Sequence, residues 1–193
     1  MPASAQPHLE PGRVYRTRDL QSWGANPTRL ARRLVREGRL ERLAQGLFYA
    51  PRSSRFGPVP PEDTEILSRF LDGDDFVLSG PPYWNALRLG ATANYPVVLV
   101  YNTRRSGEFI LGRRRFLLRR VRFPPRPTPE WYVIDLFEHR EMAGVSGARL
   151  VFALAEALLQ GRFQEPTLQR MAHEYGTLKT RELIRDAVAR AAS

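Results

Sequence analysis

The chain has 193 residues, of which 42% are hydrophobic, and carries a formal net charge of +10 at pH 7. This length and apolar content are enough to build cores for two small domains, so the composition excludes a disordered tail. The absence of cysteine excludes disulfides, zinc fingers and thiol nucleophiles.

The sequence also bounds location and cofactors. No apolar run approaches the roughly 20 residues that a membrane span requires. Residues 1–7 lack the apolar core of a signal peptide. We therefore expect a cytoplasmic protein with no membrane partner. With only three histidines and no cysteine, we expect no bound metal and no cofactor.

The positive charge lies in two blocks. Residues 1–57 hold 11 arginines against 4 acidic residues, and residues 104–126 hold 9 against 1. A basic excess that is concentrated in this way indicates a polyanionic partner such as nucleic acid.

Residues 26–38 have the signals of a complete helix. Asn26 is a candidate N-cap, Pro27 suits the first helical position, and Gly38 suits the C-terminal end. At helical spacing four apolar residues share one side and four arginines share the other. The apolar residues are Leu30, Ala31, Leu34 and Val35, and the arginines are Arg29, Arg32, Arg33 and Arg36. This basic face is either a solvated surface or a DNA contact, and the near absence of interleaved acids favours DNA.

The flanking segments complete a pattern. Residues 14–24 predict a short strand and a short helix, and residues 39–51 predict a hairpin around Gln45 and Gly46. The order of short helix, basic helix and basic hairpin predicts a winged helix-turn-helix over residues 1–57, linker included. The predicted DNA-binding residues are Thr17, Arg18, Asn26, Thr28, Arg29, Arg32, Arg33, Arg36, Arg39, Arg42 and Arg52. Among them, Thr28 and Arg29 are the expected base readers, because they lie near the start of the helix.

The prolines of residues 51–61 predict a linker, and residues 58–193 predict a second domain of the α+β class. We expect a small, mostly antiparallel sheet from strands near 76–79, 97–102, 108–111 and 115–122. Helices are expected over 61–71, 81–90, 130–144, 148–160, 166–175 and 180–192. Leu117 and Leu118 fall on opposite faces of their strand, which indicates either a bulge or a central strand that is buried on both faces.

The second basic block consists of Arg104, Arg105, Arg113, Arg114, Arg115 and Arg119 on predicted turns and strand ends. It predicts contact with the DNA backbone or with an acidic protein surface. The alternative is that these charges protect a sheet edge from aggregation.

Asp135, Glu138 and His139 share one face of a predicted helix, and this spacing raises an enzymatic alternative. A metal-dependent nuclease or nucleotidyltransferase would use Asp135 and Glu138 to hold Mg²⁺. The competing interpretation is a helix that docks its apolar side while these polar groups face solvent or pair with arginine. The acidic run from Asp72 to Asp75 is either a magnesium site or a turn.

The segment Gly38-Arg39-Leu40-Glu41-Arg42, followed by Gly46-Leu47-Phe48-Tyr49, resembles the wing of the AbiEi-type antitoxins of bacterial abortive-infection systems. The resemblance begins at residues 17–20 and the 29–38 helix, and it returns at Trp131–Leu136. It implies a non-enzymatic repressor that binds double-stranded DNA at repeats in its own promoter. It also implies an antitoxin whose cognate toxin is a nucleotidyltransferase.

Overall fold

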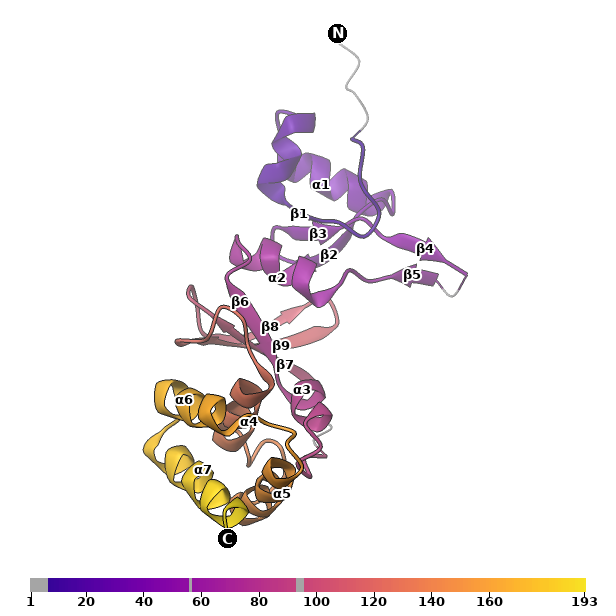
Figure 1. Ribbon diagram of the computed structural model, residues 1–193. Coiled ribbons are helices and arrows are strands. Elements are labelled where there is room, and N and C mark those ends of the chain that lie inside the picture. The colour runs from indigo at the N-terminus through magenta and orange to yellow at the C-terminus, as the bar shows by residue number, and fades with distance from the viewer. Residues whose placement is uncertain (1–6, 56, 93–95) are drawn as a thin grey trace. The chain divides into compact units, whose positions relative to one another are not determined.

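The computed structural model describes residues 7–55, 57–92 and 96–193, and it is a mixed α+β protein (Figure 1). Contacts divide the chain into two compact units. The first contains residues up to 75 together with 110–114, and the second contains 76–109 and 115–193. None of the helices in the described ranges is long and apolar enough to cross a membrane.

The N-terminal unit is built around a three-stranded antiparallel sheet in the order β1-β3-β2. Its elements are β1 (Val14–Arg16), the 3-10 helix η1 (Thr17–Trp23), α1 (Pro27–Arg36), β2 (Glu41–Ala44) and β3 (Leu47–Tyr49). The apolar side of α1 packs with η1, and Leu20, Leu30, Leu34 and Leu40 are buried there. The predicted strand, two helices and hairpin are all present.

Helix α1 begins and ends where its sequence signals predict. The side chain of Asn26 accepts a hydrogen bond from the amide of Arg29 at 2.9 Å, and Pro27 occupies the first turn. Gly38 follows the helix with a φ of +68°, a left-handed conformation that favours glycine. These contacts satisfy backbone groups that the ends of a helix leave without partners.

Helix α2 (Asp63–Leu71) belongs to the N-terminal unit, beyond the domain boundary expected after residue 57. Its Glu65 accepts a hydrogen bond from the amide of Val14 at 3.0 Å. The guanidinium of Arg16 donates to the carbonyls of Arg69 and Phe70 at 2.5 and 3.0 Å. Strand β1 therefore holds both ends of α2. Periodicity within residues 61–71 contains no signal for these contacts.

The prediction of a linker over residues 51–61 is wrong in part. Strands β4 (Arg52–Ser54) and β5 (Gly57–Val59) form an antiparallel hairpin that projects from the β1-β3-β2 sheet (Figure 1). Both strands of a two-stranded hairpin are edge strands, where proline is tolerated because its missing N–H need not face a neighbour. Pro58 accordingly lies opposite Ser53 in this pairing.

The second unit contains most of a four-stranded sheet in the order β6-β7-β9-β8. The strands are β6 (Phe76–Ser79), β7 (Val97–Asn102), β8 (Gly107–Leu111) and β9 (Arg114–Arg120). β6 pairs with β7 in antiparallel fashion, but β7 and β9 are parallel, so the sheet that was expected to be mostly antiparallel is mixed.

Strand β9 lies between β7 and β8, as expected from the interpretation of Leu117 and Leu118 as part of a central strand. Its pairing with β7 runs without a shift from Arg115 to Arg120, so no bulge interrupts this pairing. Phe116 and Leu118 are fully buried on one face, and Leu117 is half-buried on the other. The arginines at both ends of the strand are exposed.

Helices form the rest of the second unit. They are α3 (Pro81–Ala86), α4 (Pro129–Glu138), α5 (Gly147–Leu159), α6 (Glu165–Tyr175) and α7 (Leu178–Ala191). α5 packs against α7, and α4 against α6. α3 and α4 end several residues earlier than predicted. After α3, Arg88 adopts a left-handed φ of 54°. The core contains the fully buried side chains of Trp84, Phe137, Leu150 and Leu168.

Candidate functional site

The exposed face of α1 borders a groove of about 770 Å³ between this helix and the β2–β3 hairpin. Six of the predicted DNA-binding residues line the groove, and their charge is carried by four arginines. These residues are Thr17, Thr28, Arg29, Arg32, Arg36 and Arg42. Among the residues that the structure describes, no acidic group lies within ion-pair distance of Arg29, Arg32 or Arg36. The α1 side of the groove therefore presents uncompensated positive charge.

The turn of the β2–β3 hairpin is fixed against the start of η1. The amide of Thr17 donates to the carbonyl of Gly46 at 3.0 Å. Gly46 has a φ of +73°, the left-handed conformation that the turn requires. The turn residues Gln45 and Gly46 line the same groove as Arg42 and the α1 arginines.

The other predicted DNA-binding residues outside this groove have structural contacts or lie elsewhere. Asn26 caps α1, and the guanidinium of Arg18 pairs with the carboxylate of Asp72. Arg33 lies 3.7 Å from the carboxylate of Glu37. Arg39 donates to the carbonyl of Pro7 at 2.6 Å, and Arg52 is exposed on β4. The pairing of Arg18 with Asp72 also assigns the first acid of the 72–75 run to an ion pair.

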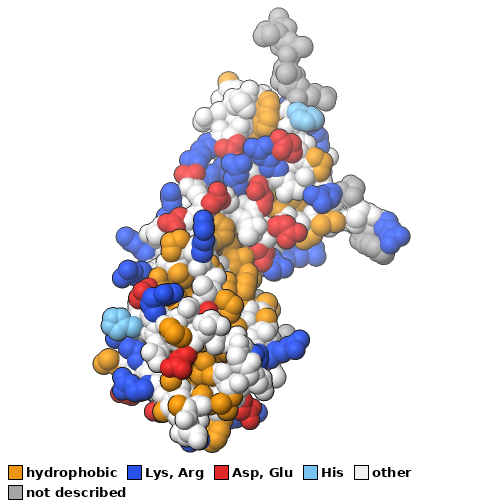
Figure 2. Space-filling view, in the orientation of Figure 1, with side chains coloured by type: hydrophobic (Ala, Val, Ile, Leu, Met, Phe, Trp, Pro, Cys, Tyr) orange, Lys and Arg blue, Asp and Glu red, His pale blue; other side chains and the backbone are white. Residues whose placement is uncertain are grey.

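The second basic block is divided between the two units, and several of its arginines have partners within their own unit. Arg113 and Arg114 belong to the N-terminal unit, whereas Arg104, Arg105, Arg115 and Arg119 belong to the second unit. Arg114 pairs with Asp63, and Arg115 lies 3.1 Å from Glu108. Arg105 lies over the ring of Phe109 at 6.0 Å. On the face drawn in Figure 2, basic and acidic side chains are likewise interleaved over the N-terminal unit.

Asp135, predicted to face solvent or hold a metal, is buried with 4% of its surface exposed. Its carboxylate accepts hydrogen bonds from the hydroxyls of Ser79 and Tyr101 and from the indole N–H of Trp84, the last at 2.7 Å. The nearby Glu138 accepts a hydrogen bond from the amide of Thr177 at 2.7 Å. A metal bound by these two carboxylates would have to displace donors that are already in place, so the enzymatic alternative stays a hypothesis.

His139 completes the buried group around Asp135. Its Nδ1 donates to the main-chain carbonyl of Asp135 at 2.9 Å and lies 3.2 Å from the carboxylate. The imidazole stacks on Trp84, with ring centroids 5.5 Å apart. Burial lowers the pKa of His139, but the hydrogen bonds and charge of Asp135 outweigh it, so the pKa is raised. Burial and the same carboxylate raise the pKa of Tyr101.

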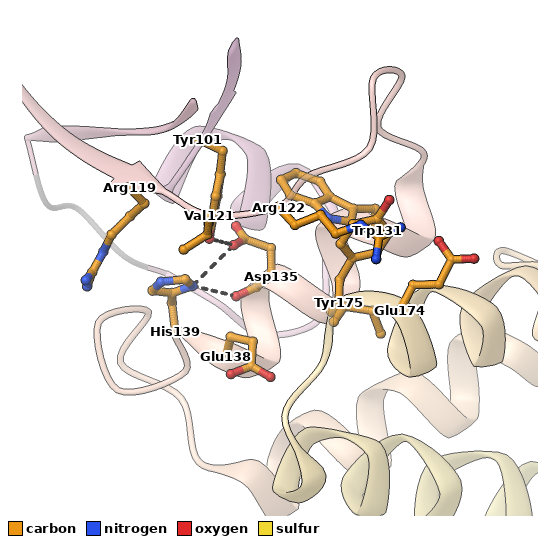
Figure 3. Close-up of a pocket in the computed structure, with 11 residues that line it drawn as sticks. Tyr101, Arg119, Val121, Arg122, Trp131, Asp135, Glu138, His139, Glu174 and Tyr175 are labelled. Carbon is orange, nitrogen blue, oxygen red and sulfur yellow. Dashed lines mark hydrogen bonds and ion pairs between the residues drawn. The ribbon is translucent and has the colours of Figure 1, made fainter. Parts of the chain in front are cut away.

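A cavity of about 370 Å³ opens beside this buried group (Figure 3). One part of its wall is polar and contains Arg119, Asp135, Glu138 and His139. The rest is formed by Val121 and Ile134, by aromatic side chains including Trp131, and by Arg122 and Glu174. Within the described ranges, no group of three histidine or acidic side chains is placed to hold a metal ion.

Sequence reasoning did not identify Ser79, Trp84 and Tyr101 as partners of Asp135, because they are 34 to 56 residues away along the chain. One available signal was the position of Asp135 inside an apolar run from Trp131 to Phe137. A carboxylate in such a run is buried only when donors satisfy it.

Comparison with known protein families finds no family model that matches this chain, and a search of curated proteins finds no match.

Proposed function

We propose that this protein is a sequence-specific DNA-binding transcriptional repressor whose N-terminal unit is a winged helix-turn-helix. The observation that carries the proposal is the exposed face of α1, where Arg29, Arg32 and Arg36 have no acidic partner among the described residues. Like charges at this helical spacing repel one another by a few tenths of a kcal/mol per pair. A DNA backbone that runs past the face turns this repulsion into attraction.

The geometry supports a division of roles within this face. Thr28 and Arg29 lie in the first turn of α1, where a recognition helix contacts base edges in the major groove. Arg32, Arg36 and Arg42 line the groove farther along and contact phosphates. Asn26 supports DNA binding indirectly, because it caps α1. Arg18 does so through its ion pair with Asp72.

A gel-shift titration on the DNA upstream of the gene tests the proposal. Arg29→Ala should weaken binding by about 1–3 kcal/mol and relax sequence preference, because a base contact is lost. Arg32→Ala should weaken binding to all sequences alike. It should also lower the salt slope, which is the slope of log affinity against log salt concentration, by about one. Arg149→Ala is a matched control, because this exposed arginine lies on α5 in the other unit. Wild-type affinity and salt slope in both α1 variants would refute the proposal.

We further propose that the repressor is the antitoxin of an AbiE-like system and acts on its own operon. The support is the resemblance of residues 38–49 to the wing of AbiEi-type antitoxins. The test is co-expression with an adjacent nucleotidyltransferase-like gene. The full chain should restore the growth that the neighbouring gene inhibits, and Arg29→Ala should still do so, because toxin neutralisation is expected to lie outside the DNA-binding face. If the wild-type chain fails to restore growth, the antitoxin role is refuted and the protein is a repressor without a toxin partner.

A further inference from the structure

We propose that the cavity beside Asp135 is a binding site for a small organic anion, whose carboxylate or phosphate group lies between Arg119 and His139. The site belongs to the second unit and is independent of DNA binding by α1. Its volume of about 370 Å³ falls within the range of small-molecule pockets, roughly 300–1,000 Å³.

The polar end of the cavity has cationic groups with unused donors. Nδ1 of His139 is occupied by Asp135, and Nε2 has no hydrogen-bond partner among the described residues. Figure 3 shows the guanidinium of Arg119 on the side of the imidazole that faces away from Asp135. Arg119 has no ion pair in the described part of the chain and acts to lower the pKa of His139. Arg119 and His139 both line the cavity, and two cationic groups that line one cavity are stabilised by an anion bound between them.

The acidic groups of the same wall are already engaged or lie elsewhere. Asp135 accepts hydrogen bonds from three side chains and pairs with His139, and Glu138 accepts from Thr177. In Figure 3, Glu174 lies on the opposite side of the cavity, near Arg122 and Trp131. Asp135 and Glu138 therefore already have donors of their own, and within the described chain the donors that remain free at this end belong to Arg119 and His139. Val121, Ile134 and Trp131 provide an apolar wall for the body of the ligand.

Proton uptake by His139 should accompany binding, since a protonated Nε2 donates to the anion. The charged and titratable groups around the cavity that bear on this proton come from four elements and the segment after β9. They are Asp135 and Glu138 on α4, Tyr101 on β7, Arg119 on β9, Arg122 after β9, and Glu174 and Tyr175 on α6. Affinity should be greatest below the pKa of His139 and should fall as pH rises through it.

The experiment follows the imidazole proton signals of the full chain by NMR while phenyl phosphate, benzoate or the neutral benzyl alcohol is added. His139→Gln identifies the His139 signal among the three histidines. At least one of the two anions should bind and raise the pKa of His139, and benzyl alcohol should not. Tighter binding of phenyl phosphate would identify a phosphate ligand, and tighter binding of benzoate would identify a carboxylate.

Arg119→Gln is the main variant, because this exposed side chain can be replaced without disturbing the core. It should weaken anion binding about tenfold or more. Arg120→Gln is the matched control, since adjacent residues of a strand point to opposite faces, and it should bind as the wild type does. Failure of both anions to shift the His139 signal would overturn the proposal. Equal binding by wild type and Arg119→Gln, or equal binding of benzyl alcohol, would overturn it as well.

Discussion

At the scale of single residues, Asp135 organises the second unit by satisfying three side-chain donors from β6, α3 and β7. Asp135→Ala removes the acceptor of Ser79, Trp84 and Tyr101 and leaves their polar groups unsatisfied in the core. We expect a loss of about 3–5 kcal/mol in the free energy of unfolding, as for other broken buried charge contacts. Denaturant unfolding measures this, with the exposed Glu141→Ala as control. A loss below about 1 kcal/mol would contradict this role.

This dependence affects the test of the enzymatic alternative. Asp135→Ala disturbs the core as well as any metal site, so lost turnover in that variant would not identify a catalytic carboxylate. Glu138→Gln is the better variant, because Glu138 is only half-buried and makes one main-chain hydrogen bond. Turnover of nucleic acid or a nucleoside triphosphate by the wild type, lost in a folded Glu138→Gln variant, would establish the enzyme and contradict a repressor without catalytic activity.

His139 should make stability depend on pH. Burial lowers the pKa of its imidazole, yet the contacts with Asp135 raise it above the ordinary value. The bound proton therefore stabilises the folded state fully below the unfolded-state pKa of about 6.5. This stabilisation is lost as pH rises through the folded-state pKa. Thermal unfolding between about pH 6 and pH 9 should show the wild type losing stability relative to His139→Gln. Parallel pH curves for the two proteins would refute the coupling.

At the scale of elements, the N-cap of α1 separates a structural role from DNA contact. Asn26→Ala should lower the free energy of unfolding by about 1 kcal/mol, because the amide of Arg29 loses its acceptor. Asn26→Asp should retain the cap and most of the stability. If Asn26 acts only as a cap, both variants should bind DNA with wild-type sequence preference once folded. A changed preference in the stable Asn26→Asp variant would show that the side chain also reads DNA.

The turn between β8 and β9 gives a second test at this scale. Gly112 has a φ of +64°, and an added Cβ would lie 2.9 Å from the Leu43 side chain. Gly161 has a similar φ of +67° but open space around it. Alanine at either position should cost about 1–2 kcal/mol for the left-handed backbone. Gly112→Ala should cost more than Gly161→Ala in denaturant unfolding, and equal losses would show that Leu43 moves aside freely.

The sequence predicted elements better than their arrangement. The helical spacing of apolar residues and the capping residues predicted the position of α1, because its N-cap, proline and C-terminal glycine lie in or next to the helix itself. The insertion of β9 between β7 and β8 had no such signal, because strand pairing depends on contacts between distant residues. The same holds for the site. The arginines of α1 were predictable from one helical face, whereas Asp135 acquires its partners only when β6, α3 and β7 are assembled.

At the scale of the whole molecule, the second basic block can be tested for a share in DNA binding. Arg104 and Arg113 are exposed and form no ion pair within the described chain, whereas Arg114 pairs with Asp63. If the block extends the DNA contact, Arg104→Ser and Arg113→Ser should each lower the salt slope of binding by about one. Arg114→Ser is the control and should have little effect. If the Arg104 and Arg113 variants keep the salt slope of DNA binding but no longer rescue growth from the toxin, the block contacts a protein partner. If they behave like the wild type in both assays, the charges protect a sheet edge from aggregation.

The position of β9 between β7 and β8 has a consequence for synthesis of the chain. β6 and β7 are complete at residue 102, but the second edge of β7 remains unpaired until residues 114–120 have been made. That edge belongs to a strand, Val97–Asn102, that is almost entirely apolar, so the nascent protein passes through a stage that is prone to edge-to-edge aggregation. The arginines from Arg113 to Arg115 are made together with the strand that pairs with this edge, and like-charge repulsion between neighbouring chains opposes their association.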